Sequence, residues 1–294
     1  MEDAPTPAIT TRLSAQVEAI VSKKIANDQL VLPSLPAVAT KCLGLLRNAD
    51  FSLRDAAAII ETDPVLAVKL LKLANSAAFG GRDATKTITA AVTRIGITGL
   101  RTFLIESSAR KLFSSPDRRI ADASAALWTH SVAVALVARD LMTICGGAEP
   151  EMAYLGGLLH DVGKPIVAAI LLDAERSVAE SKRPPSWISS ADWVAVVQDC
   201  HRRVGVALTE KWEMPPTVRA AVRDCEEFDN SDRLCAANVV RFSNALVKQK
   251  GLYVGKVDKE DVDALVMIGR SLLNLEDGAI GRATAGLARI NELL

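Results

Sequence analysis

The stretch that decides the fold reads YLGGLLHDVGKP and spans residues 154–165. Small and apolar residues predict a helix here, and Gly163 and Pro165 predict its end just after a His-Asp pair. Imidazole and carboxylate are ordinary ligands of first-row metal ions. His160 and Asp161 therefore either hold a metal or form a hydrogen-bonded polar pair inside a helical core, and the residues alone leave both interpretations open.

A second histidine, His130, lies on a helix predicted over residues 121–142. The apolar residues that share its face, at i+4, i+7 and i+11, are Val134, Val137 and Leu141. A histidine on such a face is ordinarily a satisfied core residue. Two packed antiparallel helices would, however, place His130 beside His160, which makes it a candidate metal ligand.

A metal site at this place needs a special geometry and a further ligand. Consecutive helical residues point about 100° apart, so His160 and Asp161 can both touch one ion only near a frayed helix end. Three candidate ligands fall short, because a catalytic site of this type usually has more protein ligands or a second ion. Cys200-His201 and the acids near Asp224 could supply the fourth ligand, although neither has diagnostic spacing.

The composition predicts a folded, reduced, soluble protein. The chain has 294 residues, a hydrophobic fraction of 49% and a mean hydropathy of +0.19, which is enough to bury one large core or two smaller ones. No apolar run approaches the roughly 20 residues that span a bilayer, so we expect a cytoplasmic location without membrane contact. Five cysteines without a C-x-x-C pair indicate reduced, mostly buried thiols.

The charge pattern argues against nucleic acid as the main ligand. Lys plus Arg equals Asp plus Glu at 35 each, and aromatic residues make up only 4%, too few for a base-stacking platform. We interpret the basic pairs Arg118-Arg119 and Arg202-Arg203 as solvated helix faces. A nucleic-acid-binding regulator is kept as an alternative, although the irregular spacing of its basic residues favours an ordinary solvated surface. These residues are Arg94, Arg101, Arg110 and Lys111.

The remaining pattern predicts an all-α fold. Ser52 starts one helix as its N-cap, and Asp63 with Pro64 starts the next. That second helix is apolar on nearly every face, so we expect it to be buried at the centre of its domain. A further helix is predicted over residues 12–27, and Gly96 interrupts a later one. No alternating, β-branched run bounded by turns suggests a strand.

Several motifs in order resemble one family. From residue 30 to about residue 250 the chain is similar to HDOD proteins, which are bacterial signalling modules related to the HD-domain phosphohydrolases. The motifs that carry the resemblance are LPSLPAVATKCLGLL (32–46), ETDPVLAVKLLKLANSAAFGG (61–81), AVTRIGITGLRTFLI (91–105), LWTHSVAVALVARDL (127–141), YLGGLLHDVGKP (154–165) and HRRVGVALTEKWEMP (201–215).

The resemblance implies a domain arrangement and a role. It implies an N-terminal helical subdomain over residues 29–115 and an HD-like helical bundle over 120–250, and the residue pattern outside the resemblance predicts a tail and leading helix over 1–28 and C-terminal helices over 251–294. The expected function is a non-catalytic signal-transduction module that acts through protein contacts, with a ligand in the former active-site cleft. The alternative is a metal-dependent phosphohydrolase that acts on a nucleotide or cyclic dinucleotide.

The resemblance also assigns residues to a metal site that has lost a ligand. By position, His130 matches the first ligand of the HD enzymes, and His160 with Asp161 matches their signature pair. The last ligand of those enzymes is an aspartate, and Asn244 stands at that position here, so we expect only weak binding of Mn²⁺ or Mg²⁺ and no cofactor.

A second departure lies after the W-x-x-P element, where Cys225-Glu226 replaces a histidine pair. We therefore assign no catalytic residue. His201, Asn244 and Lys164 are the expected pocket residues. Signalling proteins, and a nucleotide or cyclic dinucleotide, are the expected partners.

Overall fold

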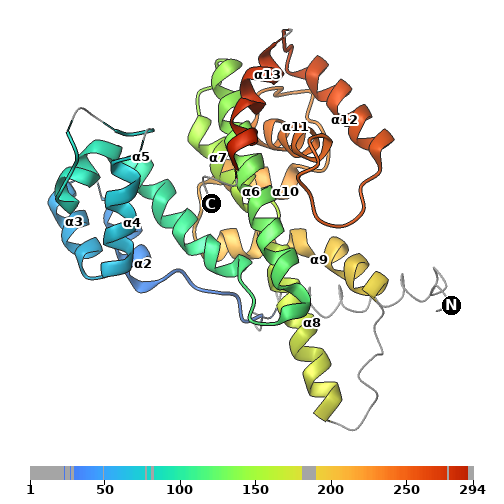
Figure 1. Ribbon diagram of the computed structural model, residues 1–294, viewed down its shortest axis with the longest axis horizontal. Helices are drawn as coiled ribbons and strands as arrows, with labels where there is room; N and C mark the ends of the chain where they lie inside the picture. Colours follow the sequence, from blue (N-terminus) through green and yellow to red (C-terminus); the bar gives the residue numbers. More distant parts are fainter. Residues whose placement is uncertain are drawn as a thin grey trace. The chain divides into compact units, whose positions relative to one another are not determined.

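The computed structural model describes residues 30–48, 50–76, 78–80, 83–180, 190–276 and 278–290, together with Lys23 and Asn27. Within these residues every regular element is a helix, so the predicted all-α fold is confirmed (Figure 1). The chain divides into two compact units, Ser34–Lys111 and a larger one made of Met1–Pro33 with Leu112–Leu294. The helix predicted over residues 12–27 lies almost wholly outside the described residues.

The smaller unit is a four-helix cluster built around its longest helix. Its helices are α2 (Ala37–Leu45), α3 (Leu53–Glu61), α4 (Pro64–Ala74) and α5 (Ile88–Ala109). Helix α5 packs against the other three. At Gly96 its backbone has φ +70° and ψ 177°, values that interrupt the helix and that a residue with a Cβ rarely adopts. The predicted interruption at Gly96 is therefore confirmed.

Side-chain caps start two of these helices where the sequence predicts them. The Ser52 side chain accepts a hydrogen bond from the backbone N–H of Asp55 at 3.1 Å. The Asp63 carboxylate accepts from the N–H groups of Val65 and Leu66, both at 3.0 Å, and Pro64 takes the first helical position. These bonds satisfy donors that a helix leaves free at its N-terminus.

The prediction that helix α4 is central and buried is wrong. Leu70 and Ala74 are fully buried, but Val65 is 65% exposed and Val68 is 53% exposed. In a unit this small the long helix α5 takes the central position, and α4 covers only one side of it. The apolar composition of a helix shows how much of its surface could be buried, but it does not decide which of its faces is covered by neighbouring helices.

The larger unit is a helical bundle that continues to the end of the described chain. The short 3₁₀ helix η1 (Arg110–Phe113) leads into it. Its helices are α6 (Arg118–Ile144), α7 (Pro150–Leu159), α8 (Gly163–Glu180), α9 (Ser190–Lys211), α10 (Pro216–Asp224), α11 (Ala236–Gln249), α12 (Lys259–Leu272) and α13 (Ala279–Thr284), followed by the 3₁₀ helix η2 (Ala285–Arg289).

Helix α7 is the core of this bundle, and small residues let its neighbours approach closely. It packs against α6, α10 and α11, and its residues from Ala153 to Leu159 are all buried. A Cβ placed on Gly157 would lie 2.8 Å from the Cα and 2.9 Å from the backbone nitrogen of Ala135 on α6. The glycine therefore allows backbone contact between α6 and α7, which brings His160 within reach of His130.

Three helical stretches are longer and more apolar than we expected from the sequence, where no apolar run approached about 20 residues. Ile88–Phe113, Arg118–Ile144 and Pro150–Asp173 are each long and apolar enough to cross a membrane by length and composition alone. The protein interior buries 44%, 50% and 78% of their most apolar windows, respectively. The expectation that no run approaches membrane-spanning length is thus wrong, because small residues and helix-packing residues raise the hydropathy of these stretches.

Candidate functional site

The His-Asp pair lies in a tight turn between two helices. His160 follows the last residue of α7, and Lys164 N–H donates to the Asp161 carbonyl at 2.9 Å as α8 begins. The predicted helix end is therefore present, but the chain re-enters a helix at Gly163. Pro165 is tolerated because it falls in the first turn of α8, where its missing N–H has no helical acceptor.

Glycine at the start of α8 is required by the neighbouring helix. A Cβ on Gly163 would overlap the backbone carbonyl of His201 on α9 and would lie 3.0 Å from the nitrogen of Gly205. The turn therefore presses directly against α9. This contact places His201 on the same pocket as the His-Asp pair.

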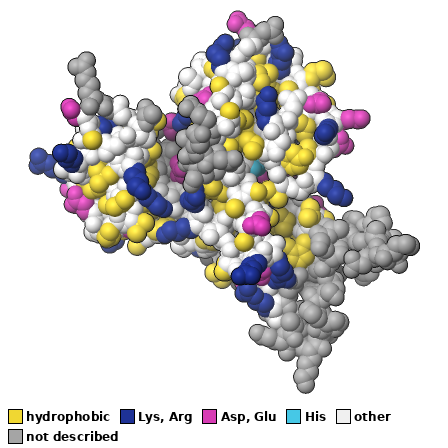
Figure 2. Space-filling model, viewed as in Figure 1, with side chains coloured by type: hydrophobic (Ala, Val, Ile, Leu, Met, Phe, Trp, Pro, Cys, Tyr) yellow, Lys and Arg dark blue, Asp and Glu magenta, His cyan; other side chains and the backbone are white. Residues whose placement is uncertain are grey.

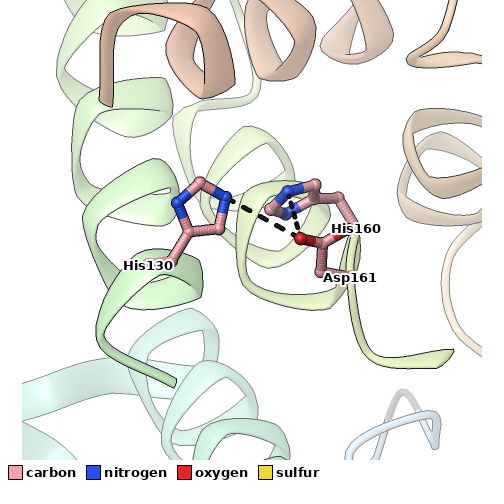
Figure 3. A group of neighbouring side chains, drawn as sticks. All are labelled: His130, His160 and Asp161. Atoms are coloured by element: carbon pink, nitrogen blue, oxygen red, sulfur yellow. Dashed lines mark ion pairs between the residues drawn. The ribbon is translucent and has the colours of Figure 1, made fainter. Parts of the chain in front are cut away.

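Three buried side chains converge at this turn (Figure 3). His130 reaches from α6, and its Nε2 lies 3.8 Å from Asp161 Oδ2, while His160 Nε2 lies 3.4 Å from the same oxygen. The exposed fractions of His130, His160 and Asp161 are 2%, 2% and 3%. In the view of Figure 2 only a trace of histidine reaches the surface. The structure thus brings together all three residues that the sequence proposed as metal ligands.

His201 joins this group from α9, as one of the two sources considered for a fourth ligand. Its Nε2 lies 3.5 Å from Asp161 Oδ1, on the other carboxylate oxygen. Of the other source, Asp224 itself is exposed and pairs with Arg223 at 2.7 Å, whereas the neighbouring Glu226 lines the cavity and pairs with Arg202 at 2.8 Å. Cys200 is buried but does not line the pocket.

Backbone carbonyls fix the tautomer of all three histidines. The Nδ1 atoms of His130, His160 and His201 each lie within hydrogen-bond distance of a carbonyl oxygen. The carbonyls are those of Leu252, Gly157 and Gln198, at 2.7, 2.7 and 2.6 Å. A carbonyl only accepts, so each Nδ1 carries a proton and each ring turns its Nε2 toward the same carboxylate. Among the described residues, His160 Nε2 has no hydrogen-bond partner.

Burial sets the charge state of these rings. Desolvation lowers the pKa of His130 to about 4 and that of His201 to about 4. Asp161 raises the pKa of each ring, but less than burial lowers it. Both rings are therefore neutral at physiological pH, the state in which imidazole binds metal.

Asp161 is ionised and already has a cation beside it. Burial alone would raise the pKa of Asp161, but the neighbouring His160 and the Lys164 ammonium hold it well below its usual range. Lys164 Nζ lies 2.7 Å from Asp161 Oδ2, the oxygen that faces His130 and His160. The expected pocket residue Lys164 thus occupies the side of the carboxylate where an ion would bind.

The turn forms one wall of a cavity of about 420 Å³. Asn244 lines it from α11, and its Oδ1 is buried without a hydrogen-bond partner. His201 and Lys164 line it as well, so the cavity contains all three residues expected in the pocket. Cys225 and Glu226, which replace a histidine pair, also reach it.

Sequence reasoning found Lys164 but missed three other cations of this cavity, Arg202, Arg241 and Lys248. Arg202, which we had placed on a solvated face, is partly buried, and its Nη1 donates to the Val222 carbonyl at 3.0 Å while its Nε lies 2.8 Å from Glu226 Oε1. The interpretation of Arg202 as a surface residue is wrong, because α10 packs against α9 at that position. Arg241 and Lys248 also line the cavity. The sequence could have indicated them, because Arg241 and Lys248 stand at i−3 and i+4 from Asn244 and therefore share its face of the helix.

The residues present fit a single metal ion by donor type. Neighbouring ligand atoms on an ion with bonds of about 2.0–2.2 Å lie roughly 3–3.5 Å apart, and the Nε2 to Oδ2 distances of 3.4 and 3.8 Å are close to that. His130, His160 and Asp161 would hold the ion, and a bound ion would act as a Lewis acid on water or phosphate. The charge is poor for tight binding, because Asp161 is the one buried carboxylate that lines the cavity among the described residues, and Lys164 competes for it.

Comparison with known proteins gives a family match and a fold match. The profile of the HDOD domain family matches residues 32–228. An uncharacterized protein of Treponema pallidum (strain Nichols) is 28% identical over 220 residues, which cover 73% of this chain and 40% of that protein. The chain therefore spans well under half the length of this relative.

Two crystal structures share the fold. A protein from Shewanella amazonensis SB2B, provisionally named a metal-dependent phosphohydrolase, aligns over 95% of this chain and 99% of its own with a TM-score of 0.70 and 23% identity. A provisionally named signal transduction protein from Marinobacter aquaeolei VT8 aligns over 96% of this chain and 66% of its own, with a TM-score of 0.54 and 19% identity. Similarity at these identities establishes the fold alone.

Proposed function

We propose that this chain, which belongs to the HDOD domain family, is a signal-transduction module that holds a ligand in its cavity without hydrolysing it and acts through protein contacts. The observation that carries the proposal is the pairing of Asp161 with Lys164. The Lys164 ammonium, 2.7 Å from Oδ2, neutralises Asp161, which is the one buried carboxylate lining the cavity in the part of the chain that the structure describes. Mg²⁺ and Mn²⁺, in contrast, are held mainly by anionic carboxylate oxygens, and a carboxylate already paired with an ammonium holds them less well.

The amide of Asn244 supports the same proposal. It lines the cavity at the position where the resemblance places the last acidic ligand, and an amide adds no negative charge. The other acids of the cavity do not compensate. Glu226 pairs with Arg202, and Asp258 caps helix α12 by accepting from the N–H groups of Glu260 and Asp261. Asp261 also lines the cavity, but it is exposed to solvent.

A change in the cavity can reach the surface through helix α12. Val262 and Leu265 line the cavity, whereas Met267 and Ile268, one turn further along, are 69% and 47% exposed. A ligand that shifts α12 therefore alters the apolar surface available to another protein. This route is part of the proposal.

A phosphohydrolase is the second candidate, and one observation favours it. The Nε2 atoms of three histidines face the Asp161 carboxylate, an arrangement that a cation between them would stabilise. The two candidates differ in what a bound metal does. In the module it is weakly held and inert, and in the enzyme it activates water.

The test is to titrate the purified protein with Mn²⁺ by calorimetry and to assay bis(p-nitrophenyl) phosphate hydrolysis in the same buffer. We expect weak Mn²⁺ binding, and hydrolysis no faster than that of His160→Ala. Asp224→Asn, which removes an exposed acid outside the cavity, serves as the control for general loss of charge. Tight Mn²⁺ binding with turnover that His160→Ala abolishes and Asp224→Asn retains would establish the enzyme instead.

A further inference from the structure

One face of helix α11 carries two cations and an amide into the cavity. Arg241, Asn244 and Lys248 are spaced i, i+3 and i+7, so they lie along one side of the helix. All three line the cavity of about 420 Å³ described above. We call these three residues the α11 face.

The cations of the α11 face are half-buried, and they differ from Lys164 and Arg202, the other half-buried cations of the cavity, in having no ion-paired acid among the described residues. Lys164 pairs with Asp161 at 2.7 Å and Arg202 with Glu226 at 2.8 Å. Among the described residues, no hydrogen bond or ion pair engages the ammonium of Lys248, and burial lowers its pKa.

Arg241 is also incompletely satisfied. Its Nη1 donates to the Cys225 carbonyl at 3.3 Å, and its guanidinium lies 5.0 Å from the ring centre of Phe228. Its Nε is buried without a hydrogen-bond partner, and no acid forms an ion pair with it in the described part of the chain. Asn244 Oδ1 is likewise buried and unpartnered. Three adjacent side chains, Arg241, Asn244 and Lys248, therefore keep polar atoms without a hydrogen-bond partner in the described part of the chain.

Removing unpaired charged and polar side chains from water costs free energy unless a ligand supplies the missing ion pair or hydrogen bond. An unpaired charge removed from water loses hydration that only an opposite charge or a hydrogen bond restores. Asp161 and Asp261 act on Lys248, and Asp261 and Glu226 on Arg241, through their charge alone, because none of them forms an ion pair with Arg241 or Lys248 within the described residues. The missing partner must be anionic, and two cations with an amide suit a group with several oxygens.

We propose that the α11 face binds an oxyanion of about two negative charges, of the phosphate type, carried by a small molecule and bound without a metal ion. The guanidinium of Arg241 can donate two parallel N–H bonds to such a group, and Lys248 adds a point charge. The cavity exceeds the size of one phosphate, and its volume lies in the range of about 300–1,000 Å³ of small-molecule sites. This inference rests on the proposed function, because it makes the cavity a site of recognition.

The experiment uses the full chain and inorganic probes. Phosphate and pyrophosphate are titrated by calorimetry in EDTA at constant ionic strength, with succinate as a dicarboxylate comparator. Arg241→Met and Lys248→Met are each expected to weaken pyrophosphate binding about tenfold or more, the loss typical of one charged hydrogen bond. Lys250→Met is the matched control, because Lys250 is exposed near the end of the same helix and does not line the cavity.

Each outcome decides the inference. Pyrophosphate binding in EDTA that falls in both α11 variants and is unchanged in Lys250→Met supports it. Equal loss in all three variants, or stronger binding of succinate than of phosphate, overturns it. If no probe binds with or without Mn²⁺, the inference fails while signalling through protein contacts stands. If binding requires Mn²⁺ and is lost in His160→Ala but not in the α11 variants, the inference fails. If the bound probe is also hydrolysed in that case, the proposed function is contradicted as well.

Discussion

Replacing Lys164 by methionine tests how the buried carboxylate is balanced. The Lys164 and Asp161 side chains are 13% and 5% exposed, and their charged atoms lie 2.7 Å apart. At an effective dielectric constant of 20 this separation corresponds to about 6 kcal/mol of gross Coulomb attraction. Removing one partner of a buried pair costs about 3–5 kcal/mol, because the other charge remains buried and unpaired. We expect Lys164→Met to lower the free energy of unfolding by that amount.

The same variant should respond to metal differently from the parent protein. Without the ammonium, Oδ2 of Asp161 is free to bind an ion together with His130 and His160, so Mn²⁺ should recover much of the lost stability. Urea unfolding followed by circular dichroism, with and without Mn²⁺, measures both effects. Lys250→Met, at an exposed position, should stay within about 0.5 kcal/mol of the parent.

A double variant separates the buried charge from lost packing. Lys164→Met with Asp161→Asn removes both charges, and it should be more stable than Lys164→Met alone and should not respond to Mn²⁺. A loss of under about 1 kcal/mol in Lys164→Met, or equal stabilisation of parent and variant by Mn²⁺, would refute the assignment of Lys164 as the internal counterion of Asp161.

Two further predictions concern pH and packing. His130 and His201 have folded pKa values of about 4, so below the unfolded value of about 6.5 the unfolded chain binds more protons. Stability should therefore be constant above that pH and fall between about 6.5 and 4 by on the order of 3 kcal/mol per histidine, and a urea midpoint that does not change from pH 7.5 to 4.5 would contradict this. Gly157→Ala should destabilise the protein by about 1–3 kcal/mol because its Cβ meets the α6 backbone. Gly281→Ala, whose Cβ would meet nothing within 4 Å, should be neutral or slightly stabilising, and equal stability of the two variants would show that α6 and α7 can separate freely.

Local chemistry made part of the site predictable. Adjacent His160 and Asp161 followed by Gly163 required a polar turn at a helix end, whatever packs around it. His130 could be added because helical periodicity placed it on a face with apolar neighbours. His201 was named as one of two sources, and nothing in its own segment separated it from the acids near Asp224.

Arg202, Arg241 and Lys248 were not found in this way. Arg202 reads as one half of a basic surface pair, and only the packing of α10 on α9 turns it inward. The role of Lys248 depends on where α11 faces the turn after α7, a contact between segments nearly ninety positions apart. The Leu252 carbonyl that orients His130 lies 122 residues away in sequence.

The sequence by itself determined the helices, their caps and the chemistry of the His-Asp turn, because these depend on residues within a few positions of one another. Only the tertiary structure decided that helix α4 is peripheral, that Lys164 neutralises Asp161 and that Arg241 and Lys248 share the cavity with Asn244. Periodicity defines which side chains share a face of a helix, but the partner that covers this face is set by packing among segments distant in the chain.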